Sequence, residues 1–339
     1  MQPSSQQWER LYEAAIAFKA AEPWSILEND DLFAVKDPNS ELTGYCCVMG
    51  AGGEVYGMAL YLGRSGLDTL LAMFNDEIDE DPLFVQHCLM LSFDDREDLH
   101  PKEKDIIKKL GLKFRGRGAW PSFKLHEPGY YPWLLEQAHD VSFLTEALEQ
   151  AIQVAATVRE DPHFLHSQND LLLHRVGKPQ SDGVLAWQNE WQLPAEENEK
   201  QVGQSPYVPN ELLLAKLKKT IKSSNSVWEI DLFFVPAPVM EQERPYFPMA
   251  LAVMDQDSQQ IIAMHMFEQT EAPIVVPQKF IELLQMVKQL PDKLVAPKAA
   301  AFQHLSPVID FFSMSCFIQN GPLMLDDFKQ SLFERFGRN

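Results

Sequence analysis

The segment from Ser226 to Phe336 constrains the fold most strongly, because its order of expected elements leaves few arrangements open. Three apolar runs separated by turn residues predict three antiparallel strands. Alternating helices and strands follow, with Pro277 expected at the first helix start and Ser306-Pro307 opening the second. The expected strands are 227–235, 249–254, 260–267, 293–296 and 316–319, and a last helix is capped by Asp326 or Asp327. The pattern predicts an α/β domain with the order βββαβαβα.

The preceding part of the chain predicts an α+β domain with a mainly antiparallel sheet. Its expected helices are 7–21, 67–74, 101–110 and 141–158, and its expected strands are 32–35, 44–49, 55–62, 87–93, 171–176 and 184–193. The polar, Pro-bearing stretch after them is typical of a linker. We therefore expect an acidic domain at 1–193, a linker at 194–210 and the α/β domain at 211–339.

Charge is distributed unevenly along the 339 residues, whose formal net charge is −20. From Glu211 onward there are 12 basic and 15 acidic residues, a net of −3, so the earlier part carries −17. A field of this sign repels phosphate backbones, which makes nucleic acid an unfavoured partner. The four cysteines form no C-x-x-C pair, no apolar run is long enough to span a membrane, and no signal peptide is recognised. A cytoplasmic protein with buried thiols and no membrane contact is expected.

One basic patch interrupts the acidic part. Lys113, Arg115 and Arg117 alternate with less polar residues, so on a strand the three cations would share one face. The patch could bind an anion or a nucleic acid, with Trp120 and Phe123 stacking on bases. Alternatively it is a sheet edge protected by charge, which is the interpretation we prefer.

Other polar clusters suggest metal sites only superficially. The acidic run 76–81 lacks the order of a calcium loop, and 94–100 is typical of a strand-to-helix loop with N-capping carboxylates. His163 and His166 have no carboxylate at the offset of H-E-x-x-H, so solvated histidines are expected. The sequence has no P-loop and no G-x-S-x-G elbow.

The order of elements resembles the ribonuclease-H-like fold of nucleases and integrase-type transposases, and Trp228 to Asp231 resembles the W-x-x-D opening of integrase cores. The resemblance implies two Mg²⁺ or Mn²⁺ ions held by three carboxylates. Asp231 matches the first position. The second falls at 295–299, where no acid stands. The third could be Asp326, Asp327 or Glu334.

A second resemblance covers most of the chain. The turn P-G-Y-x-P-W at 128–133 and the run W-E-x-D-x-F-x-x-P-x-P-V at 228–239 are similar to a group of uncharacterised bacterial proteins that pair two domains of unknown function. This resemblance implies a bacterial, cytoplasmic protein and no particular substrate. Some members carry a C-terminal cysteine-rich metal motif that this sequence lacks.

Three functional hypotheses remain open, and one of them is a pocket in the N-terminal domain for a ligand that the sequence does not identify. The favoured one is a non-catalytic interaction or binding protein, with a degenerate ribonuclease-H-like domain, no cofactor and an unidentified protein partner. The alternative is a divalent-metal-dependent nuclease or transposase relative with a rearranged site. It would use Asp231, Glu229 and Asp327, and the basic patch Lys113, Arg115, Arg117 and Trp120 would hold the nucleic-acid backbone.

Overall fold

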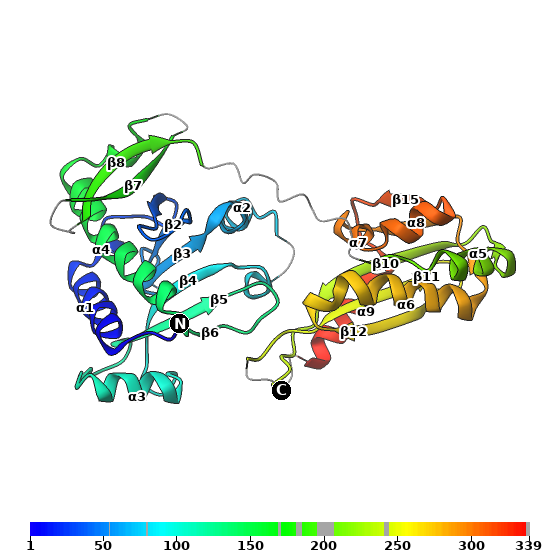
Figure 1. Ribbon diagram of the computed structural model, residues 1–339, viewed down its shortest axis with the longest axis horizontal. Coiled ribbons are helices and arrows are strands. Elements are labelled where there is room, and N and C mark those ends of the chain that lie inside the picture. Colours follow the sequence, from blue (N-terminus) through cyan, green and yellow to red (C-terminus); the bar gives the residue numbers. More distant parts are fainter. Residues whose placement is uncertain are drawn as a thin grey trace. The chain divides into compact units, whose positions relative to one another are not determined.

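The computed structural model describes residues 1–53, 55–78, 81–168, 171–180, 185–194, 207–240 and 244–336. The chain divides into two compact units (Figure 1). The N-terminal unit comprises Met1–Pro128 and Pro132–Glu199, and the C-terminal unit comprises Gly129–Tyr131 and Lys200–Asn339. The short segment Gly129–Tyr131 belongs to the second unit because the Gly129 carbonyl accepts from the Phe247 amide at 2.8 Å and the Tyr131 amide donates to the Pro245 carbonyl at 3.0 Å.

The N-terminal unit is built on an eight-stranded sheet of order β6-β5-β4-β3-β2-β1-β7-β8. The strands are β1 (Phe33–Lys36), β2 (Thr43–Met49), β3 (Gly57–Leu62), β4 (Cys88–Asp94), β5 (Trp120–His126), β6 (Trp133–Leu134), β7 (Leu172–Pro179) and β8 (Leu185–Gln192). All neighbours are antiparallel except β1 and β7. The expected antiparallel meander and hairpin are therefore present.

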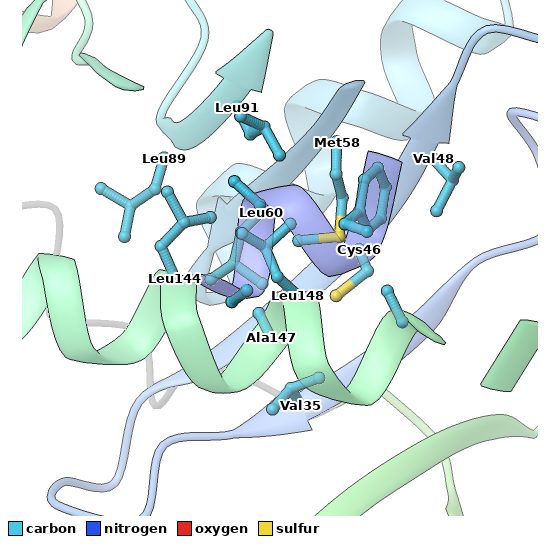
Figure 2. Packing of buried hydrophobic residues seen from close by; sticks show 14 of the residues in the cluster. Val35, Cys46, Val48, Met58, Leu60, Leu89, Leu91, Leu144, Ala147 and Leu148 are labelled. Carbon is cyan, nitrogen blue, oxygen red and sulfur yellow. The ribbon is translucent and has the colours of Figure 1, made fainter. Parts of the chain in front are cut away.

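Helices cover both faces of this sheet. They are α1 (Ser5–Ala21), α2 (Gly63–Phe74), α3 (Pro101–Lys109) and α4 (Ala138–Glu160). The larger core lies between the sheet and helices α1 and α4. Figure 2 shows Leu144, Ala147 and Leu148 of α4 facing Leu60 and Cys46 of the sheet. A smaller cluster on the other face places Leu67 and Leu70 of α2 against the sheet.

The C-terminal unit contains a five-stranded sheet of order β12-β11-β10-β14-β15. Its elements are α5 (Glu211–Thr220), β9 (Lys222–Ser223), β10 (Val227–Phe234), β11 (Met249–Asp255), β12 (Gln260–Phe267), α6 (Ala272–Val287), β13 (Gln289–Leu290), β14 (Lys293–Ala296), α7 (Ala300–Gln303), α8 (Ser306–Phe312), β15 (Ser315–Ile318) and α9 (Met324–Phe336). Strands β10, β11 and β12 are antiparallel, whereas β10, β14 and β15 are parallel. This is a mixed α/β unit.

Two apolar clusters lie on opposite faces of this sheet. On one face, Trp228 and Ile230 pack with residues of α5, α6, α7 and α8. On the other face, Phe233 and Val235 pack with residues of α9. Strand β10 lies at the centre of the sheet and is covered on both sides, which explains why it is almost entirely buried.

Several local predictions from the sequence are wrong. Helix α6 begins at Ala272 rather than Pro277, because Pro273 already occupies its first turn and Pro277 is accommodated inside the helix. Ser306 does not cap α8; its hydroxyl donates to the Gln303 carbonyl. The cap of α3 is the His100 ring, which accepts from the Lys102 amide at 3.2 Å, and not a carboxylate of the preceding loop.

The alternation of Lys113, Arg115 and Arg117 would place three cations on one face of a strand, but residues 112–115 do not form a strand. Gly116 and Gly118 follow with φ values of 95° and 55°, and these left-handed conformations turn the chain before it can join the sheet at Trp120. Most of the expected linker 194–210 lies outside the described residues. Within the described parts of the chain, no helix is long and apolar enough to cross a bilayer.

Candidate carboxylate site and basic patch

Strand β10 presents two carboxylates to helix α9. Because side chains alternate along a strand, Glu229 and Asp231 share the face of Phe233, while Trp228 and Ile230 point to the opposite core. Glu229 is 1% exposed and Asp231 is 5% exposed. Carboxylates buried this deeply need hydrogen-bond or ionic partners in the fold.

Glu229 holds the beginning of α9. Its Oε2 accepts from the Leu325 amide at 2.9 Å, and its Oε1 accepts from the Gln256 side-chain amide at 2.8 Å. The first amides of a helix have no partner within the helix, and a carboxylate there also interacts favourably with the helix dipole. Both oxygens of Glu229 are thereby used in joining strand, turn and helix.

Asp231 holds the second turn of the same helix. Its Oδ2 lies 2.7 Å from the Lys329 ammonium, and its Oδ1 accepts from the Leu232 amide at 2.8 Å. The Lys329 ammonium is also 3.3 Å from Asp326 Oδ1 and 5.5 Å from the centre of the Phe233 ring. A single lysine therefore pairs with one buried acid of the sheet and one acid of its own helix.

The two partners stabilise each other's charged form. Burial raises the pKa of Asp231 above its usual 3.8, and the hydrogen bond and charge of Lys329 offset only part of that rise. Burial alone would lower the pKa of Lys329, but Asp231 and Asp326 outweigh it and raise this pKa. The 2.7 Å separation of carboxylate and ammonium is the geometry of an ion pair.

The structure does not bring together the three acids of the alternative hypothesis. Glu229 and Asp231 are close to α9, but the Asp327 side chain is exposed, and it is Asp326 that approaches Lys329. The expected second acid position is occupied by Val295 and Ala296, which are buried in apolar clusters. Among the residues that the structure describes, no group of three or more His, Cys, Asp or Glu side chains is placed to hold a metal ion.

Sequence reasoning missed Lys329. The signal was available, because Lys329 lies on the apolar stripe of α9 that also carries Leu325, Phe328, Leu332 and Phe333. A lysine on the buried stripe of an amphipathic helix needs a carboxylate partner. Which carboxylate would supply the charge was not readable from local sequence, because Asp231 is 98 residues away.

In the basic patch, exposed cations alternate with more buried apolar side chains, although the segment is not a strand. Lys113, Arg115 and Arg117 are exposed, while Leu112 and Phe114 pack against the core. Arg117 Nε lies 3.5 Å from Asp95 Oδ2, which neutralises part of its charge. The neighbouring hollow of about 650 Å³ mixes signs, since Asp95, Arg96, Glu97, Asp98 and Arg117 all line it.

The aromatic residues of this patch are poorly placed to stack on bases. Trp120 is only partly exposed, with the Arg96 guanidinium 5.8 Å from its ring centre and the Phe114 ring at 5.6 Å. Phe123 is 2% exposed, so its predicted stacking role is wrong. Lys124, another nearby cation, is 2.6 Å from the buried Glu103 carboxylate.

His163 and His166 are both exposed, as expected for solvated histidines. His166 Nε2 lies 2.9 Å from Asp31 Oδ1. A different histidine is more strongly held: His139 Nε2 lies 2.6 Å from Oδ2 of Asp37, whose side chain is 1% exposed. No local pattern indicates this contact, because the two residues are 102 positions apart.

The comparisons with known proteins match this division of the chain. Residues 8–175 match the family model of a domain of unknown function, DUF7309, and residues 213–333 match that of a second domain of unknown function, DUF6930. The chain therefore pairs two families without an assigned activity. Among curated proteins, none matches this sequence significantly.

Several solved structures resemble about a third of the chain, and the resemblance is weak. The integrase catalytic core domain of HTLV-2 in complex with magnesium, in its dimeric form, has 10% sequence identity and a TM-score of 0.25, covering 32% of this chain and 68% of that one. The trimeric form has 11% identity and a TM-score of 0.23, covering 33% and 85%. The core of BIV integrase has 10% identity and a TM-score of 0.22, covering 34% and 66%. Likenesses at this level assign no activity to this chain.

Proposed function

We propose that the chain, which matches two domains of unknown function, is a non-catalytic interaction protein whose C-terminal unit is a degenerate ribonuclease-H-like domain. The strand order supports this fold proposal. An antiparallel trio, β12-β11-β10, is extended by two parallel strands on the β10 side, and helices lie on both faces. Fold alone does not carry activity, so the functional part of the proposal rests on the site.

One observation gives the main support for a non-catalytic role. The Lys329 ammonium lies 2.7 Å from Asp231, the carboxylate that would hold a metal ion under the nuclease alternative. A divalent cation at this carboxylate would meet the positive charge of Lys329 at close range. Glu229 is also engaged, since both of its oxygens accept hydrogen bonds. The two buried acids are explained by their contacts with α9 and its surroundings, and a metal is not needed to balance them.

Further properties belong to the same proposal. We place the protein in a reducing, cytoplasmic compartment, which is supported by its four free cysteines, three of them buried. We propose a protein as partner and no resident cofactor, with domains at 1–193 and 211–339 joined by the segment 194–210. The net charge of −20 disfavours nucleic acid.

The test is an incubation of the full chain with labelled single- and double-stranded DNA and RNA in Mg²⁺ or Mn²⁺, followed by gel analysis. We expect the probes to stay intact. Asp231→Asn is the matched control, because it keeps the shape of the side chain while removing its charge. Metal-dependent cleavage by the wild type that disappears in Asp231→Asn would overturn the proposal and establish the nuclease alternative. Cleavage that is equal in both proteins comes from a contaminant or from a site elsewhere in the chain. If it disappears on further purification it is a contaminant and the proposal stands, whereas cleavage that co-purifies with the chain would also overturn the proposal.

A further inference from the structure

Helix α5 presents an exposed face that combines apolar and basic side chains. Leu214 and Leu217 are buried against the C-terminal core. On the opposite side of the helix, Leu212, Lys216 and Lys219 follow each other at the spacing of one helical stripe. Leu212 is 76% exposed. The outer stripe of α5 is thus not part of the core.

Two further lysines lie close to the end of α5. The Lys222 amide donates to the Lys288 carbonyl at 3.1 Å, which joins the segment after α5 to the end of α6. Both of these lysine side chains are exposed. Lys218 lies on the flank of α5, with its ammonium 5.5 Å from the centre of the Phe311 ring. We call the outer stripe Leu212, Lys216 and Lys219, together with the adjacent Lys222 and Lys288, the α5 face.

The charge of the α5 face is largely uncompensated. Residues 211–222 contain four lysines and one acid, Glu211, in a chain whose net charge is −20. Lys216, Lys219, Lys222 and Lys288 form no ion pair with any residue that the structure describes. By contrast, Lys279 on the neighbouring helix α6 is 2.8 Å from Glu282. The α5 face is therefore a local positive region on an acidic protein.

We propose that the α5 face binds an acidic polypeptide segment that also carries apolar side chains. Carboxylates on such a segment would complement the lysines, and Leu212, which is 76% exposed on the same stripe, would accept an apolar side chain. A phosphate backbone offers nothing to this apolar group and is repelled by the net charge. This inference rests on the proposed function, because it names a surface and a partner class for the interaction protein.

Fluorescence anisotropy of a labelled synthetic helical peptide, with glutamates on one face and leucines on the other, tests the proposal with the full chain. We expect saturable binding that weakens with added salt, because ion pairs at the surface are screened. Lys216→Glu together with Lys219→Glu should weaken binding by about tenfold or more, since two attractions become repulsions. The matched control is Lys108→Glu together with Lys109→Glu, two exposed lysines in the last turn of α3, which should leave the affinity unchanged.

Three results would overturn the inference. The first is equal affinity for the peptide and for its glutamine analogue. The second is an equal loss of affinity from the α3 control. The third is a duplex DNA probe that binds more tightly than the peptide and loses its affinity in the α5 variant, since this would make the α5 face a nucleic-acid surface. None of these results bears on Asp231 and Lys329, so the cleavage assay remains an independent test of the proposed function.

Discussion

At the scale of single residues, Lys329 decides how the C-terminal carboxylates are interpreted. The Asp231 side chain is 7% exposed and the Lys329 side chain 22%, so water screens their contact weakly. Removing one partner of such a pair leaves a charge buried without compensation, which is far more costly than removing a surface pair.

Lys329→Met should therefore lower the free energy of unfolding by about 3 kcal/mol, measured by urea denaturation of the full chain. The double variant Asp231→Asn and Lys329→Met should recover most of that loss, because it removes both charges. Lys279→Met is the matched control, since its ammonium pairs with Glu282 on the exposed side of α6. It should change the unfolding free energy by less than about 1 kcal/mol. If Lys329→Met proves as mild as Lys279→Met, the ion pair does not hold α9 to the sheet.

At the scale of elements, the contact between His139 and Asp37 joins the start of α4 to the turn between β1 and β2. Burial favours the neutral form of His139, but its hydrogen bonds to Asp37 and Asp140 outweigh this and raise its pKa above 6.5. Burial also favours the neutral form of Asp37, which by itself would raise the pKa of this carboxyl. The Ser40 hydroxyl, the Asn39 amide and His139 together lower it below 3.8. Glu146 and Asp140 are further acids near this pair.

These pKa shifts define the pH range in which the contact between His139 and Asp37 stabilises the fold. The stabilisation from His139 is complete below its usual pKa of 6.5 and is lost as the pH rises through its higher folded value. The stabilisation from Asp37 is complete above its usual pKa of 3.8 and is lost as the pH falls through its lower folded value. We expect His139→Gln to lower the melting temperature of the N-terminal unit at pH 5.5 and to have a smaller effect at pH 8.5, measured by calorimetry. An equal decrease at both pH values would contradict an ionic contact, and His163→Gln at an exposed site is the control.

At the scale of the whole molecule, hydrophobic periodicity predicted most elements but few of the contacts that define the site. Strands such as β10 and β12 were recognisable because their apolar runs end at turn residues, whereas Pro277 was mistaken for a helix start because proline inside a helix is unfavourable. The parallel pairing of β1 with β7 joins residues such as Ala34 and His174 and has no local signature. The same holds for the partner of Lys329, which only tertiary structure supplies. The sequence thus predicted two carboxylates on one strand face but not what neutralises them.

The most direct test of the account is a titration of the full chain with Mn²⁺, followed by electron paramagnetic resonance or isothermal titration calorimetry. If Asp231 is already paired with Lys329, the wild type and Asp231→Asn should bind Mn²⁺ equally weakly, with no saturable site that depends on Asp231. A saturable Mn²⁺ site in the wild type that is lost in Asp231→Asn would show that the carboxylate is available to metal and would contradict the central claim.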